Sequence, residues 1–126
     1  MARSLEISQV VIDSVLSYAK MTYPKEGILL LQGKASKEKI LIDSVVIPPF
    51  ATHGHGFSSF PLDTLPSLLS LVGVAHSHPN GVLQPSTEDL NHFYGRVMVI
   101  TAYPYESEKD LAVFDGRGYP IQYRII

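Results

Sequence analysis

The sequence has no cysteine and no tryptophan, and only 17% of its residues are charged. Without cysteine, the chain can form neither disulfides nor thiolate metal sites. The formal net charge of -2 leaves no basic excess of the kind that binds nucleic acid. No apolar run approaches the ~18 residues of a membrane-spanning helix, and MARSLEISQV has no apolar signal core. These absences predict a cytoplasmic protein that binds neither nucleic acid nor membrane.

Apolar residues, by contrast, make up 45% of the 126 positions, which is enough for one packed core. We therefore expect a single domain over residues 1–126. Apolar side chains recur at helical spacing over residues 8–20, with Ser8 as the candidate N-cap. The apolar runs 27–32 and 40–47 flank the turn GKASKEK and predict a β-hairpin.

The second half of the chain predicts strands between short helices. Segment 48–61 is rich in Gly, Ser and Pro and is expected to be a loop. DTLPSLLSL (63–71) predicts a short helix, because Pro66 is tolerated in a first turn. STEDLNHFY (86–94) predicts a helix closed by Gly95. Strands are expected at 71–76, 97–102, 111–114 and 120–126, the last two joined by the turn DGRG. The pattern predicts an α/β fold with one mixed sheet.

The stretch GVAHSHPNGVLQPSTEDL (73–90) concentrates the polar groups that can carry chemistry. His76 and His78 are two residues apart at the end of a predicted strand, so both imidazoles point to the same face. Asp89 lies in the first turn of the helix that Ser86 opens. Two neutral imidazoles and one carboxylate form a known catalytic zinc set, in which the fourth position is left for water.

Simpler interpretations exist for these residues. Ser86 and Asp89 also fit a capping box at a helix start. Glu88 is an alternative carboxylate. His92, three residues after Asp89, is an alternative ligand but is expected to pack or to lie at the surface. The second pair, His53-Gly-His55, is expected to be loop, with one histidine lining the cleft as the lesser alternative.

The joint spacing resembles the motif of the JAMM (MPN+) metalloproteases: His-Ser-His, seven residues, Ser, two residues and Asp. Here it runs from His76 to Asp89, and the family's upstream glutamate matches Glu26 in YPKEGILLLQG. The resemblance covers nearly the whole chain, and HSHPNG and ITAYPY look closest to small archaeal members. It implies a cytidine-deaminase-like fold, in which helices flank a curved mixed β-sheet.

The resemblance also implies a role for each matched residue. His76, His78 and Asp89 would hold one zinc ion per chain. Glu26 would be the general acid/base, and Ser86 would donate a hydrogen bond to the oxyanion. The reaction would be hydrolysis of the (iso)peptide bond after the C-terminal Gly-Gly of a ubiquitin-like protein, releasing it from lysine or another amine. From the residues alone, an exposed glutamate at a strand start is an equal interpretation of Glu26.

Three other functions remain open on the sequence. A bacterial host would suggest release of a sulfur-carrier protein from an adduct on its C-terminus. A non-catalytic scaffold of the MPN type typically lacks one or more ligands, whereas this chain keeps all of them. A RadC-like protein carries a similar HxHP…PSxxD motif, but the acidic balance and the missing helix-hairpin-helix segment count against it.

Overall fold

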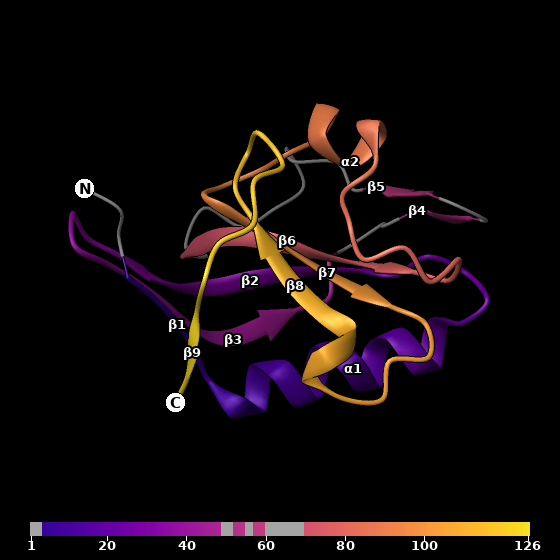
Figure 1. Cartoon of the computed structure of the whole chain (residues 1–126), viewed down its shortest axis with the longest axis horizontal. Coiled ribbons are helices and arrows are strands. Elements are labelled where there is room, and N and C mark those ends of the chain that lie inside the picture. Colours follow the sequence, from indigo (N-terminus) through magenta and orange to yellow (C-terminus); the bar gives the residue numbers. More distant parts are fainter. Residues whose placement is uncertain (1–3, 49–51, 55–56, 60–69) are drawn as a thin grey trace.

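The computed structural model describes residues 4–48, 52–54, 57–59 and 70–126 (Figure 1). Seven strands form one curled mixed sheet in the order β8-β7-β6-β2-β3-β1-β9. They are β1 (Ser4–Ile7), β2 (Ile28–Ala35), β3 (Lys39–Val46), β6 (Leu71–His78), β7 (Val97–Ala102), β8 (Leu111–Phe114) and β9 (Arg124–Ile125). The hairpin of β4 (Thr52–Gly54) and β5 (Phe57–Ser59) forms a separate small sheet.

Helices α1 (Gln9–Thr22) and α2 (Thr87–Asn91) flank the large sheet, and a 3-10 turn, η2 (Glu108–Asp110), precedes β8. In Figure 1, α1 runs along one side of the sheet and α2 lies on the other. The predicted α/β fold with one curved mixed sheet flanked by helices is therefore confirmed. Within the described residues, no helix has the length and apolarity needed to cross a membrane.

Helix α1 forms because its apolar residues fall on one stripe that packs against the sheet. The Ser8 hydroxyl accepts a hydrogen bond from the Val10 backbone N–H at 3.3 Å, which confirms the predicted N-cap. The residues buried on this stripe are Val11, Ile12, Val15, Leu16 and Ala19.

The sheet separates two apolar clusters, because successive side chains of a strand point to opposite faces. Ala75 belongs to the cluster that contains the α1 stripe. Leu30 and Val74 belong to the second cluster, on the other face. His76 and His78 continue the alternation of Val74, so both imidazoles emerge on the face away from α1.

Strands β2 and β3 form the predicted antiparallel hairpin. Strand β6 lies between β2 and β7, so both of its edges are paired. It runs antiparallel to β2, with Ile28 opposite His76 and Leu30 opposite Val74. The histidine motif therefore ends a central, fully paired strand, which gives it a rigid support.

Two predictions about loops and short elements need correction. Segment 48–61 is not all loop, because the backbone pairs between β4 and β5 within it. The predicted helix 86–94 ends at Asn91, because His92 leaves the helical conformation with a φ of -111°. Gly95 does adopt a positive φ of 84°, but it lies four residues after the last residue of the helix. The predicted helix 63–71 begins outside the described residues, and Leu71 already belongs to β6.

The two ends of the chain also differ from the prediction. No strand was expected at β1, which pairs in parallel with both β3 and β9. The predicted strand 120–126 shrinks to β9, at the opposite sheet edge from β8. The turn DGRG forms as expected: Asp115 Oδ1 accepts the backbone N–H groups of Arg117 and Tyr119. Beyond a single bridge at Pro120, however, the chain leaves β8 and crosses to β1.

Candidate metal centre

The site forms where β2 begins and β6 ends. Because Ile28 lies opposite His76, extending the same antiparallel register places Glu26 opposite His78. Alternate residues share a face, so the Glu26 side chain points to the face of both histidines. All three residues are buried, with exposed fractions of 4% for Glu26, 3% for His76 and 6% for His78. The interpretation of Glu26 as an exposed strand-start glutamate is therefore wrong.

Ser77, between the two histidines, fixes the start of β2. Its hydroxyl accepts a hydrogen bond from the Gly27 N–H at 2.7 Å, and its own N–H donates to the Gly27 carbonyl at 3.0 Å. A Cβ at Gly27 would lie 2.7 Å from Thr22 Oγ1 and 3.3 Å from Ser77 Oγ, so glycine permits this close approach. The two hydrogen bonds hold the backbone directly after Glu26 and so position its side chain.

Helix α2 supplies the second carboxylate. The Ser86 hydroxyl accepts the Asp89 N–H at 3.0 Å, and Asp89 Oδ2 accepts the Ser86 N–H at 2.9 Å, which makes the expected capping box. Asp89 is 5% exposed, whereas Ser86 is exposed. The Ser86 hydroxyl accepts in the cap and keeps its own proton for donation, so capping is compatible with its predicted oxyanion role.

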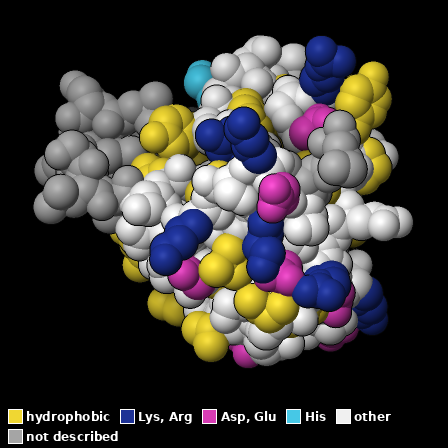
Figure 2. Space-filling view, turned by 90° about the vertical axis from the view of Figure 1, so that its left-hand side faces the viewer, with side chains coloured by type: hydrophobic (Ala, Val, Ile, Leu, Met, Phe, Trp, Pro, Cys, Tyr) yellow, Lys and Arg dark blue, Asp and Glu magenta, His cyan; other side chains and the backbone are white. Residues whose placement is uncertain are grey.

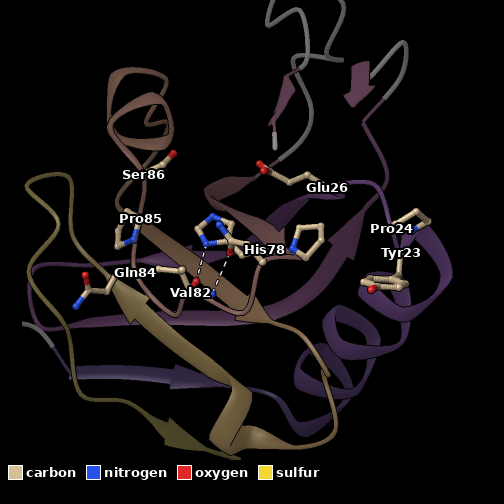
Figure 3. A pocket seen from close by; sticks show the side chains of 10 residues that line it. Tyr23, Pro24, Glu26, His78, Val82, Gln84, Pro85 and Ser86 are labelled. Atoms are coloured by element: carbon tan, nitrogen blue, oxygen red, sulfur yellow. Dashed lines mark hydrogen bonds between the residues drawn. The ribbon is translucent and has the colours of Figure 1, made fainter. Parts of the chain in front are cut away.

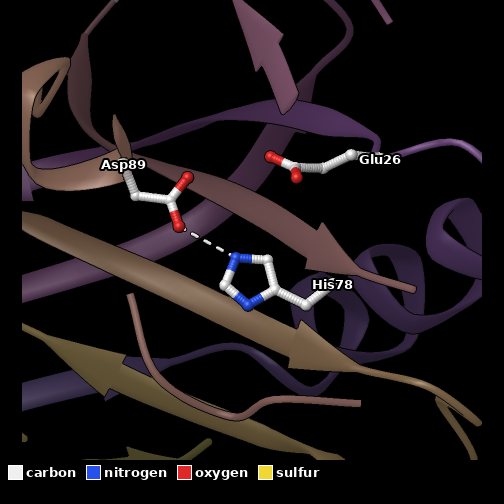
Figure 4. A group of neighbouring side chains, drawn as sticks. All are labelled: Glu26, His78 and Asp89. Atoms are coloured by element: carbon white, nitrogen blue, oxygen red, sulfur yellow. Dashed lines mark hydrogen bonds and ion pairs between the residues drawn. The ribbon is translucent and has the colours of Figure 1, made fainter. Parts of the chain in front are cut away.

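The buried donors converge on one space (Figure 4). His78 Nε2 lies 2.8 Å from Asp89 Oδ2, while His76 Nδ1 lies 3.8 Å from Asp89 Oδ1 and 3.6 Å from Glu26 Oε1. One donor atom each from Glu26, His78 and Asp89 lie within 4.8 Å of one another. A tetrahedral zinc ion holds its ligand atoms about 3.3 Å apart, so these spacings suit one such ion.

Two ligand sets fit this arrangement. The first is the predicted set of His76, His78 and Asp89. In the second, Glu26 takes the place of His76, because Glu26, His78 and Asp89 form the compact donor group. Both sets share His78 and Asp89, so these two residues define the centre. They differ in whether the carboxylate of Glu26 is a ligand or stands beside the ion.

Electrostatics couple His78 to Asp89. Burial alone would lower the pKa of His78, but the hydrogen bonds to Asp89 and to the Val82 carbonyl raise it above its ordinary value. Burial alone would raise the pKa of Asp89, but His78, His76 and the Ser86 N–H lower it to about 2. The Val82 carbonyl lies 2.8 Å from His78 Nδ1 and orients the ring, so that Nε2 faces Asp89.

Glu88 and His92, the alternative ligands, lie outside this buried cluster. Glu88 and His92 are both exposed, and His92 Nδ1 lies 3.0 Å from the Glu88 carbonyl oxygen. This matches the expectation that His92 lies at the surface. His53 falls in β4, and His55 lies outside the described residues.

A cavity of about 460 Å³ opens onto the centre (Figure 3). Figure 3 shows Tyr23, Pro24 and Glu26 on one side of His78, and Gln84, Pro85 and Ser86 on the other. The remaining lining residues are Pro79, Asn80 and Val82. Sequence reasoning missed the contributions of Ser77 and Tyr23, because each acts through a segment that is distant in the chain.

Comparison with known proteins identifies the family. Residues 8–115 match the family described as prokaryotic homologs of the JAB domain. A probable metalloprotease from Haloferax volcanii is 32% identical over 127 residues, covering 92% of this chain and 78% of the relative. A JAB1/MPN domain protein from Archaeoglobus fulgidus is 28% identical, with a TM-score of 0.74 over 96% of this chain and 98% of that chain. A solved structure described as a JAMM metalloprotease-like zinc site in the proteasome and signalosome is 25% identical, with a TM-score of 0.70 over 98% of both chains.

The chain therefore belongs to the JAB/MPN family, which confirms the resemblance stated from the motif. Together, the family and the buried donor cluster support a metallopeptidase with a metal site at His78 and Asp89.

Proposed function

We propose that this protein is a zinc metallopeptidase that hydrolyses the (iso)peptide bond after the C-terminal Gly-Gly of a ubiquitin-like protein. The observation that carries the proposal is the convergence of Glu26, two imidazoles and Asp89 at one end of an open cavity. This is an acid/base beside a ligand set, in a chain that is 32% identical to a probable metalloprotease.

In this proposal His76, His78 and Asp89 would hold one zinc ion, and such an ion would lower the pKa of a bound water molecule from 15.7 to about 7. Glu26, 3.6 Å from His76, accepts the proton of the attacking water and later gives a proton to the leaving amine. The exposed hydroxyl of Ser86, which lines the cavity, donates a hydrogen bond to the oxyanion of the scissile carbonyl.

A glycine tail suits the approach to this centre. Glycine has no side chain to clash with the cavity walls, and its backbone stays free to pair with a strand edge. The hairpin β4–β5 lies on the same side of the large sheet as α2 and offers strand edges for such pairing (Figure 1). Conjugates to amines other than lysine, including adducts of a sulfur-carrier protein, would present the same C-terminal glycine carbonyl to the centre.

The alternative functions have weaker support. A non-catalytic scaffold has no use for a buried acid/base beside a complete ligand set. A RadC-like role in DNA binding calls for a basic surface. On the face shown in Figure 2, Lys and Arg side chains alternate with Asp and Glu, and no stripe of one sign gathers there.

The direct test is incubation of the purified protein with a panel of ubiquitin-like fusions and conjugates. We expect cleavage after the second glycine and a sharp fall in rate when the tail Gly-Gly is replaced by Ala-Ala, because the carbonyl is misplaced. Equal cleavage of both tails, or brisk digestion of casein, would instead mark a general metallopeptidase.

A further inference from the structure

Tyr23 stands at the mouth of the cavity and is held by two other tyrosines. Its ring stacks on Tyr103 with centroids 4.7 Å apart and an interplanar angle of 27°, and it meets Tyr105 edge-on at 6.4 Å. Tyr105 is 1% exposed, whereas Tyr23 and Tyr103 are 45% and 49% exposed. Tyr23 is therefore exposed and yet supported on one side, which are the properties of a rigid aromatic anchor in a binding site.

This anchor lies on a defined side of the reaction centre. Tyr23 and Pro24 line the same cavity as Glu26, His78 and Ser86. In Figure 3, Tyr23, Pro24 and Glu26 lie on one side of His78, and Ser86 lies on the opposite side. In the proposed reaction, Ser86 serves the oxyanion and Glu26 returns a proton to the leaving amine. The amine therefore departs on the side where Tyr23 and Pro24 lie.

We propose that Tyr23 and Pro24 form a leaving-group subsite whose occupant is the aliphatic stem of a lysine side chain. This inference rests on the proposed function and adds a preference for bonds to the lysine Nε over bonds to an α-amine. Four methylene groups follow a lysine nitrogen, and they can pack on a tyrosine ring and a proline ring. In a linear peptide the nitrogen is followed by a branched carbon and a carbonyl, whose polar atoms would face these apolar walls without a partner.

The charges of the lining agree with this occupant. Among the described residues that line the cavity, Glu26 is the only carboxylate, and there is no lysine or arginine. No lysine or arginine side chain in that lining repels the ammonium that lysine becomes once it is released. The exposed part of the Tyr23 ring can also attract this cation.

The test compares two substrates that differ only beyond the scissile nitrogen. The conjugate that the wild type cleaves fastest in the panel is prepared on the Nε of acetyl-lysine amide and on the α-amine of glycine amide. Burial of a methylene is worth roughly fourfold in affinity, so we expect a preference for the lysine form of about tenfold in kcat/KM. Tyr23→Ala should lower kcat/KM for the lysine form about tenfold, mainly through KM, and for the glycine form by less than about twofold.

Matched variants separate this role from a structural one. Tyr23→Phe keeps the ring and should retain the preference. Tyr119→Ala removes another exposed tyrosine, which does not line the cavity, and should change neither substrate. Tyr103→Ala removes the support without touching the cavity lining, so its effect should be smaller than that of Tyr23→Ala and non-additive with it.

These experiments distinguish failure of the leaving-group subsite from failure of the proposed function. An unchanged preference in Tyr23→Ala, or an equal loss on both substrates at wild-type zinc content, would overturn the subsite and leave the proposed function standing. Failure of the wild type to cleave any conjugate of the panel would overturn the proposed function itself.

Discussion

The backbone N–H of Gly27 donates to the hydroxyl of Ser77 over 2.7 Å, and this bond ties the strand after Glu26 to the strand of both site histidines. In a regular antiparallel rung the acceptor would be the Ser77 carbonyl, so here a side chain replaces a backbone group. The separation of Glu26 from the imidazoles therefore depends on this hydroxyl as well as on the backbone bond from the Ser77 N–H to the Gly27 carbonyl.

Ser77→Ala should leave the buried Gly27 N–H without this acceptor. We expect a loss of about 1–3 kcal/mol in the free energy of unfolding, full zinc content, and a fall in kcat of about tenfold or more because Glu26 shifts. Thermal unfolding, elemental analysis and turnover of the same preparation measure the three effects. Ser77→Thr keeps the hydroxyl and should restore most of the turnover. Wild-type kcat in Ser77→Ala would show that the bond does not position Glu26.

Glu26→Gln keeps the size of the side chain and removes its proton acceptor. If Glu26 is the acid/base and not a ligand, this variant should retain zinc and lose on the order of 10²-fold or more in turnover. Zinc content is measured beside the rate. Loss of the metal would assign Glu26 to the ligand set in place of His76, and unchanged turnover would show that another group moves the proton.

Removal of a shared ligand should release the metal. His78→Ala and Asp89→Ala each leave two protein ligands, so both should lose most of the bound zinc. Glu88→Ala alters an exposed residue of α2, and His92→Ala alters the exposed residue that follows this helix, so the two variants are the matched controls. If a control variant lost zinc while Asp89→Ala retained it, the choice of carboxylate would be wrong.

The stability of the metal-free protein should depend on pH through the interaction between His78 and Asp89. In the folded protein the pKa of Asp89 is lowered from 3.8 to about 2. Ionised Asp89 therefore contributes on the order of 2 kcal/mol at most to the free energy of unfolding. This contribution is present above pH 3.8 and is lost as the pH falls toward 2. The folded pKa of His78 is raised above 6.5, so its contribution is present below pH 6.5 and is lost as the pH rises through the folded value.

Chelator-treated protein should therefore be most stable between pH 3.8 and 6.5. Denaturant unfolding across pH 2 to 9 measures this profile. Asp89→Asn removes the negative charge that pairs with His78, so it should flatten the stability profile on both its acidic and its alkaline side. An identical profile in the two proteins would mean that the pair does not govern stability in this range.

Local sequence patterns were sufficient to predict the helices and strands in which apolar residues recur with a strong period. The strands 97–102 and 111–114 have the predicted bounds, and the helix over 8–20 differs from α1 by one or two residues. Strand β1 escaped prediction because it includes Glu6, a charged residue whose partners Lys39 and Arg124 come from β3 and β9. The pairing that stabilises such a strand is tertiary and leaves no local signal.

The candidate site likewise combines residues that local patterns predict with one residue that they do not. His76, His78 and Asp89 lie within one short stretch, where strand alternation and a helix start suffice to bring them together. Glu26 reaches them only because β2 pairs with β6, and this register cannot be read from the composition of either strand. The resemblance to JAMM proteins identified Glu26, whereas residue patterns alone only favoured it among twelve carboxylates, because it borders an apolar strand.

We propose that this chain cleaves its substrate by means of one metal ion at His78 and Asp89. The most direct measurement is the rate of cleavage of a Gly-Gly conjugate as a function of zinc bound per chain, from chelated to fully reconstituted protein. We predict a rate that rises in proportion to bound zinc and reaches its maximum at about one ion per chain. Undiminished cleavage by zinc-free protein, or the absence of zinc uptake on reconstitution, would contradict the account.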